Sequence, residues 1–304
     1  MTDYVIWRTL GAGFFSIVAS TLAYFDLASS RGLTPVVDFQ NHDSVYRENH
    51  PVHGTGNMWE YYFEQPSGKG VESLAGNFVP TDGTWPKGYP YSLTGSPIYP
   101  AMWKHFIKLN EPTRSFVDSS CEILQVSEQT LGVHFRGQEM RSARGHKYPP
   151  TIRQTTEAIR WNLENYDFNE ILLVTEAQQY VRYFLKSFGN RVIPSPSFRL
   201  SYRNSYQLRK APRHNHRYLL GLEALRDAVA LSKCGGIVCG HSNLSEAALM
   251  LAGENLLTAV KIMQGRNSFR PYVAPFKWYL KAALPKALGG FPAWDPEKQL
   301  RQIV

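Results

Sequence analysis

Short apolar runs alternate with longer amphipathic segments along the second half of the chain. The runs have the length and composition of buried strands, and the amphipathic segments repeat their apolar residues with the period of a helix. Strands are predicted at residues 131–135, 171–175, 191–193 and 235–240, and helices at 150–164, 177–188, 219–233 and 245–252. Because strands that alternate with helices form a parallel sheet with helices on its faces, this half is predicted to be a doubly wound α/β domain.

The first half begins with the same pattern and then loses it. An apolar run at 4–7, a helical apolar repeat at 17–27 and a second run at 34–39 predict one βαβ unit. Residues 40–120 are rich in Pro, Gly, Tyr and Trp, with no long periodic stretch beyond a short aromatic helix that Pro66 closes. A loop-rich first domain is therefore expected.

Length, charge and cysteine content narrow the class of protein. With 304 residues the chain is long enough for two domains, placed at 1–125 and 126–270, and a segment 271–304 that crosses back to the first domain or contacts a membrane. A net charge of +8 favours anionic partners, although a solubilising surface explains it equally well. Three cysteines without metal-type spacing, no signal-peptide pattern and no long apolar run lead us to expect a cytoplasmic protein without zinc, disulfides or a spanning helix.

The strand at 131–135 leads into the motif HFRGQE, which holds three candidate functional residues. Arg136 has a planar guanidinium that suits a bidentate grip on phosphate. Such a contact strengthens when negative charge builds up on a departing diphosphate, which is how it would accelerate transfer. His134 is suited to contact a base or ribose, or else is an ordinary core histidine. Glu139 is a candidate general base or a partner for Arg136.

The segment HSNLSE follows the strand at 235–240 and predicts the start of a helix. Asn243 with Glu246 three residues later resembles a capping box. The N–H groups at such a helix start form an anion site, to which Ser242 and Asn243 would add side-chain donors for a phosphate. An ordinary helix cap explains the same residues.

Two carboxylates, Glu223 and Asp227, lie four residues apart on the predicted helix 219–233, where like charges repel. Arg226 or a loop cation would neutralise them. Alternatively, Asp227 accepts hydrogen bonds from a ligand, as a carboxylate does from the N1–H and N2 amine of guanine.

The first turn, GAGFFS, lacks the full dinucleotide-binding pattern G-x-G-x-x-G. Gly11, Ala12 and Gly13 permit close backbone approach to a phosphate, and a tight strand-to-helix turn explains them equally well. The sequence contains no Walker loop, no Gly-x-Ser-x-Gly motif and no Asp-x-Asp pair to hold a metal ion against a nucleotide sugar. Cationic side chains and a helix end must therefore balance a departing diphosphate.

The Gly-containing first turn, the His-x-Arg strand end and the Ser/Asn helix start together resemble the fucosyltransferase superfamily, which includes nodulation, core α1,6- and protein O-fucosyltransferases. The resemblance spans most of the chain and is close at 131–139, 171–176 and 221–253. It implies a GT-B fold, with two Rossmann-like domains facing a cleft, and inverting transfer from GDP-fucose without a metal or other cofactor. The sequence departs from the family pattern at Gly137, in place of a second arginine, and at Glu139 and Glu176, where family members have Asp.

The resemblance also assigns roles to residues. His134 and Asp227 would recognise guanine or its ribose, and Arg136 would hold the β-phosphate as a catalytic residue. The remaining nucleotide-binding candidates are Ser242, Asn243, Gly11, Ala12, Gly13 and Glu176. Glu139 is the candidate catalytic base, with Glu176 or Asp38 as alternatives.

The leading hypothesis is a glycosyltransferase that moves fucose, or a related 6-deoxyhexose, from its GDP carrier to a glycan hydroxyl in bacterial surface polysaccharide or oligosaccharide synthesis. The acceptor is expected to be a glycan or lipid-linked glycan at the cytoplasmic membrane face. Trp59, Tyr61 and Tyr62 would stack on its sugars or else pack in the core, and the aromatic, basic tail at 271–294 would contact a membrane surface or pack across the domains.

Three alternatives stay open on the sequence. They are a transferase for another nucleotide sugar, a non-catalytic protein that binds polyanions or a membrane surface, and a dinucleotide oxidoreductase. Nucleic acid is not expected as a partner.

Overall fold

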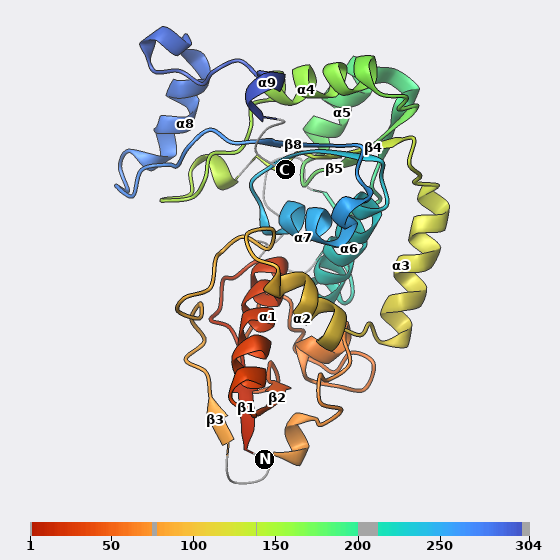
Figure 1. Cartoon of the computed structure of the whole chain (residues 1–304), viewed down its shortest axis with the longest axis vertical. Helices are drawn as coiled ribbons and strands as arrows, with labels where there is room; N and C mark the ends of the chain where they lie inside the picture. The colour runs from red at the N-terminus through yellow and green to blue at the C-terminus, as the bar shows by residue number, and fades with distance from the viewer. Residues whose placement is uncertain (1, 75–77, 138, 200–211, 300–304) are drawn as a thin grey trace. The chain divides into compact units, whose positions relative to one another are not determined.

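The computed structural model describes residues 2–74, 78–137, 139–199 and 212–299, which form two compact units (Figure 1). The first unit holds the described residues of Met1–Ile123 and Leu208–Arg226, and the second holds those of Leu124–Gln207 and Asp227–Val304. The expected boundary after residue 125 falls close to the first of these divisions. Residues 212–226, placed by the sequence in the second domain, group with the first unit.

The second unit is built on a parallel sheet with the order β6-β5-β4-β7-β8. Its strands are β4 (Thr130–His134), β5 (Glu170–Val174), β6 (Val192–Pro194), β7 (Gly236–Gly240) and β8 (Thr258–Ile262). Helices α4 (Ile152–Asn165) and α5 (Gln178–Phe188) lie on one face, and α6 (His216–Ser232) and α7 (Asn243–Ala252) lie on the other (Figure 1). The predicted doubly wound sheet is confirmed.

The order of the strands reverses at β4. From β4 the chain proceeds to β5 and β6 on one side, and it later places β7 and β8 on the other side. His134 pairs in register with both Val174 and Cys239, so the carboxyl ends of the three central strands lie at one edge. Open α/β sheets bind ligands at such a reversal, outside the carboxyl ends of the strands.

Local sequence explains the close packing around β4. A Cβ atom on Gly132 would lie 2.8 Å from Leu231 Cδ2, so glycine lets α6 approach the strand. On the opposite face the fully buried Val133 and Ile159 belong to one apolar cluster with the central strands and α4 and α5. Thr151 begins α4 with a complete capping box to Gln154.

The first unit has a smaller parallel sheet with the order β2-β1-β3. Its regular elements are β1 (Asp3–Ile6), α1 (Phe14–Ser30), β2 (Thr34–Val37), η1 (Met58–Tyr61), η2 (Val71–Ser73), β3 (Phe78–Pro80), α2 (Ile98–Phe106) and α3 (Glu111–Leu124). The predicted βαβ unit is confirmed as β1, α1 and β2, and the short aromatic helix is the 3-10 turn η1.

The expectation of a loop-rich region at 40–120 was wrong for α2 and α3. Helix α3 buries only one narrow row of side chains: Thr113, Val117, Cys121 and Leu124. Thr113 and Cys121 in that row are not strongly apolar, and Phe116 and Ile123 lie outside it, so the apolar period is too weak to predict a helix. Helix α2 is short and carries Pro100 inside it, which reads as a helix breaker.

The C-terminal tail groups with the second unit. It contains α8 (Ala274–Ala283), η7 (Lys286–Leu288) and α9 (Pro296–Gln299); the remaining short turns of this unit are η3 (Glu139–Arg141), η4 (Gly189–Arg191) and η6 (Gly253–Asn255). Within the described ranges, none of the helices has the length and apolar character needed to span a bilayer.

Candidate functional site

The carboxyl edge of the second unit's sheet gathers most of the candidate residues. His134 ends β4, Thr175 follows β5, Ser195 follows β6, and Ser242 comes shortly after β7. A pocket at the reversal between β4 and β7 is lined by His134, Arg136, Met140, Pro149, Pro150, Gly240, His241 and Ser242. The structure therefore brings the two predicted motifs HFRGQE and HSNLSE to one place.

His134 is buried and is tied to the start of α7. Its Nδ1 atom lies 2.6 Å from Ser245 Oγ, and Ser242 Oγ is 3.4 Å away. Burial, reinforced by the positive charge of Arg136, lowers the pKa of His134 from 6.5 to about 3. The ring is consequently neutral at physiological pH, and its Nδ1 side is held by the protein while the residue lines the pocket.

The helix start after β7 differs by one residue from its predicted form. Ser242, not Asn243, is the N-cap, and its Oγ accepts a hydrogen bond from the Ser245 N–H at 3.2 Å. The predicted capping role of Glu246 was wrong, because this fully buried carboxylate forms an ion pair with Lys261 of β8 and lies 3.4 Å from His241 Nδ1. Asn243 is the first helical residue and is partly exposed.

The turn after β4 is held by a carboxylate from the next strand end. Glu176 Oε1 accepts a hydrogen bond from the Gly137 N–H at 2.8 Å. This contact fixes the backbone next to Arg136, which is half-buried and lines the pocket. Glu139 begins the short turn η3, and its side chain lies outside the described part of the structure.

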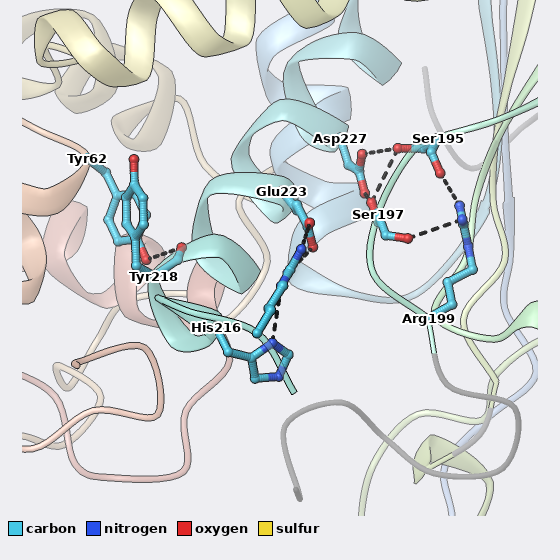
Figure 2. A network of polar contacts seen from close by, with 9 residues as sticks. Tyr62, Ser195, Ser197, Arg199, His216, Tyr218, Glu223 and Asp227 are labelled. Atoms are coloured by element: carbon cyan, nitrogen blue, oxygen red, sulfur yellow. Dashed lines mark hydrogen bonds and ion pairs between the residues drawn. The ribbon is translucent and has the colours of Figure 1, made fainter. Parts of the chain in front are cut away.

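Asp227 lies under the segment that follows β6. Ser195 Oγ donates a hydrogen bond to one of its oxygens, and Ser197 Oγ donates to the other at 2.8 Å. Arg199 holds the same segment, since its guanidinium donates to the carbonyl oxygens of Ser195 and Ser197 (Figure 2). It also donates to the Thr175 carbonyl oxygen. Asp227 is thus buried, and its carboxylate already accepts hydrogen bonds from two hydroxyl groups of the protein.

Ser195, Ser197 and Arg199 were missed by the sequence reasoning. The signal was present, because SPSFR comes just after the predicted strand at 191–193 and so belongs to the carboxyl edge.

One more polar group lies at this edge. Thr175 Oγ1 is buried and has no hydrogen-bond partner among the residues that the structure describes, an arrangement that a bound ligand would complete.

The two carboxylates predicted on one face of α6, Glu223 and Asp227, have different hydrogen-bond partners. Arg213 forms two hydrogen bonds to the Glu223 carboxylate, at 2.6 and 3.0 Å, and its Nε lies 3.3 Å from His216 Nδ1. The guanidinium carbon of Arg226 lies 5.9 Å from the centre of the Phe116 ring. Arg213 is thus the loop cation foreseen as one alternative, and Asp227 accepts hydrogen bonds from the serine segment.

In the first unit the predicted aromatic residues belong to the core. Trp59, Tyr61 and Tyr62 expose 1% of their surface or less. The Tyr62 hydroxyl donates to the Tyr218 carbonyl oxygen at 2.9 Å (Figure 2). A Cβ atom on Gly221 would lie 2.2 Å from that hydroxyl. The expectation that these rings stack on an acceptor sugar was wrong, because packing leaves no ring face open.

The first turn of the chain leaves open space at its two glycines, and the Tyr46 hydroxyl accepts the Phe14 N–H at the start of α1, at 2.8 Å. Gly11 has a φ of +96°, which favours glycine, and Gly13 is the N-cap of α1 without a side-chain hydrogen bond. A Cβ atom on either glycine would meet nothing within 4 Å. Gly11, Ala12 and Gly13 lie in the first unit, whereas the other nucleotide-binding candidates lie in the second.

The carboxylate of the alternative base Asp38 is hydrogen-bonded within its own loop. Its carboxylate accepts hydrogen bonds from the backbone N–H groups of Gln40 and Asn41 and from the Asn41 amide at 2.9 to 3.0 Å. Among the described residues there is no cluster of three or more His, Cys, Asp or Glu side chains arranged to hold a metal ion.

Comparison with known proteins gives a fold. No family model and no curated protein matches the sequence. The structure is similar to NodZ α-1,6-fucosyltransferase soaked with GDP-fucose, with a TM-score of 0.57 and 16% identity over 86% of this chain and 95% of that chain. For fucosyltransferase NodZ from Bradyrhizobium the TM-score is 0.55 and the identity 15%, over the same shares. The chain therefore has the α/β GT-B fold of these enzymes.

Proposed function

We propose that this protein is an inverting, metal-independent glycosyltransferase that moves fucose, or a related 6-deoxyhexose, from GDP to a glycan hydroxyl. One observation carries the proposal: His134, Arg136 and the Ser242 helix start surround one pocket at the strand reversal of the sheet. That is where a fold of this kind binds a nucleotide. The fold is that of NodZ, whose structures were obtained with GDP-fucose and with GDP.

The donor diphosphate is the ligand that the pocket suits best. Arg136 offers a fixed pair of donors, and the first N–H groups of α7, with Ser242 and Asn243, offer the positive end of a helix. Together they balance the charge that builds up on departing GDP. A neutral His134, fixed through Nδ1 by Ser245, would present Nε2 to the ribose or base.

Asp227 and the serine segment form the proposed guanine end. The Asp227 carboxylate accepts hydrogen bonds from Ser195 and Ser197, so it is ionised and faces donors. The N1–H and N2 amine of guanine would replace the serine hydroxyls as donors to this carboxylate. Uracil and cytosine lack this pair of adjacent donors, so the same geometry would select guanine.

The transfer step needs a base. An acceptor hydroxyl oxygen attacks C1 of the sugar from the face opposite GDP, the bond between C1 and the β-phosphate oxygen breaks, and a carboxylate takes the hydroxyl proton. Glu139 is the proposed base, since Glu176 holds the Gly137 N–H and Asp38 holds its own loop. We place the acceptor, a glycan or lipid-linked glycan, in surface polysaccharide or oligosaccharide synthesis on the cytoplasmic side.

A thermal-shift measurement with GDP, UDP, CMP and NAD at equal concentration, in the presence of EDTA, tests the donor. A ligand present at about 100 times its Kd and bound only to the folded state stabilises by about 2.7 kcal/mol. We expect a shift with GDP alone. A shift with UDP or CMP would overturn fucose while keeping a glycosyltransferase, and a shift with NAD would favour an oxidoreductase. No shift with any nucleotide would overturn the proposal in favour of a polyanion-binding protein.

A further inference from the structure

Helix α8 carries an apolar face that points away from the protein. Of the fifteen exposed large hydrophobic side chains in the described part of the chain, seven lie within residues 269–288. Those on α8 and just before it recur at helical spacing, as Tyr272, Phe276, Tyr279 and Leu280 do. Tyr272 is 88% exposed and Phe276 is 72% exposed, values far from those of a core-facing row.

The inner side of α8 is fixed, so this exposure is not the result of a loosely attached helix. Trp278 is buried and its Nε1 donates to the Pro149 carbonyl oxygen at 3.0 Å. The Arg141 guanidinium lies 4.3 Å from the centre of the Trp278 ring, and the Asn267 amide donates to the Ala274 carbonyl oxygen. Trp278 thus anchors the helix on its inner side, and Phe276, Tyr279 and Leu280 are exposed to solvent.

The chain segment that carries α8 holds charges of one sign. Between Glu254 and Asp295 the sequence has no carboxylate and six cations: Lys261, Arg266, Arg270, Lys277, Lys281 and Lys286. Lys261 is paired with Glu246, which leaves five in the segment that carries α8. Arg270 and Lys286 are exposed at the two ends of the apolar row. We call these two cations, with Tyr272, Phe276, Tyr279, Leu280 and Leu288, the α8 surface.

An apolar row bordered by cations is the pattern of a helix that lies in the interface of an anionic membrane. A second copy of this chain fits less well, because a symmetric contact would bring two sets of cations together. We infer that the α8 surface docks on an anionic lipid bilayer, with Phe276 and Leu280 entering the acyl boundary and Arg270 and Lys286 meeting headgroups. This inference does not rest on the proposed transferase activity.

Helix α8, which carries the α8 surface, is connected to the candidate pocket through a residue that contacts both. Pro149, which accepts the hydrogen bond from Trp278, also lines the pocket, as does Met140 next to Arg141. Docking would therefore fix the pocket wall near the bilayer, where a lipid-linked acceptor would be held.

The test is sedimentation of the full chain with vesicles of phosphatidylcholine, with and without phosphatidylglycerol. We expect binding to the anionic vesicles. A Phe276→Ser, Leu280→Ser variant should bind at least about tenfold more weakly, because each side chain loses its apolar contact with lipid. An Arg270→Gln, Lys286→Gln variant should lose on the order of tenfold and much of the salt dependence.

Ile123→Ser is the matched control, because Ile123 on α3 is 80% exposed and lies outside the α8 surface. It should bind vesicles like the wild type. Thermal unfolding and GDP binding of each variant separate a failure to fold or to bind donor from a failure to dock. Equal vesicle binding by the wild type and the Phe276→Ser, Leu280→Ser variant would overturn the inference. So would no vesicle binding at all, or a wild-type dimer that this variant abolishes.

Discussion

Two strand-to-helix turns of this protein, one in each unit, are built in different ways. After β1, residues Gly11 to Gly13 lead into α1, and the Tyr46 hydroxyl accepts the N–H of Phe14, the first helical residue, at 2.8 Å. After β7, Ser242 caps α7, Ser245 binds His134, and Glu246 is paired with Lys261. Further helix N–H groups at each turn suit an anion, and the second turn adds the neutral imidazole of His134 and the guanidinium of Arg136, which line one pocket with Ser242. On the proposed function we therefore expect the second turn to bind the donor and the first to allow close approach of a phosphate.

The largest effect should come from removing the cation beside the second turn. Arg136→Ala should weaken GDP binding by about 10- to 100-fold, since a charge-assisted hydrogen bond contributes roughly 1.5 to 3 kcal/mol. Release of GDP from GDP-fucose should fall further, because the contact strengthens as the leaving group gains charge. Isothermal titration and a GDP-release assay measure the two quantities.

Arg153→Ala is the control for that variant. Arg153 lies on α4 of the same unit and pairs with Glu157 with its own side chain 80% exposed, so its loss should change neither quantity. Unchanged GDP affinity in a folded Arg136→Ala protein would remove Arg136 from the proposed donor site and leave His134 and the Ser242 cap as what distinguishes the second turn.

The elements around the second turn could be predicted because β4, β5 and β7 are fully or nearly fully buried and alternate with helices. Strand β8 was missed because Thr258 and Lys261 leave only a short apolar run in it. The contact of Ser195 with Asp227 joins residues 32 positions apart, which no local pattern encodes. Ser242 and Asn243 are both good caps, so only the backbone could decide between them.

The second effect concerns the neutral imidazole. The folded pKa of His134 is about 3 and its ordinary value is 6.5, so below about pH 6.5 the unfolded chain binds a proton that the folded chain rejects. The stability that this histidine contributes is therefore present above pH 6.5 and is lost as the pH falls toward 3. Between about pH 7.5 and about pH 5 the loss should be about 2 kcal/mol.

His134→Asn keeps an amide near the Nδ1 position and removes the titration. Urea unfolding across this pH range should give a variant curve that is flatter than the wild-type curve by that amount. Parallel curves would mean that His134 is not a neutral, desolvated group at the helix start.

The smallest predicted effects come from changing the N-cap residues of the two helices, Ser242 of α7 and Gly13 of α1. Ser242→Ala removes the oxygen that accepts the Ser245 N–H and should cost about 1 kcal/mol of unfolding free energy. Gly13→Ser adds a cap where the backbone is already extended, at φ −69° and ψ 158°, and where a Cβ meets nothing within 4 Å. It should stabilise the free protein by a few tenths of a kcal/mol. Urea unfolding measures both changes.

Gly13→Ser then decides what the first turn is for. If Gly13 is needed only to form the turn, the Gly13→Ser variant should turn over the donor at the wild-type rate. If Gly13 is needed so that a phosphate can approach closely, the variant should be slightly more stable and have a raised KM for GDP-fucose, because the serine side chain would occupy space that the ligand uses. We expect the second result. Higher stability together with unchanged donor kinetics would leave the second turn as the whole of the donor site.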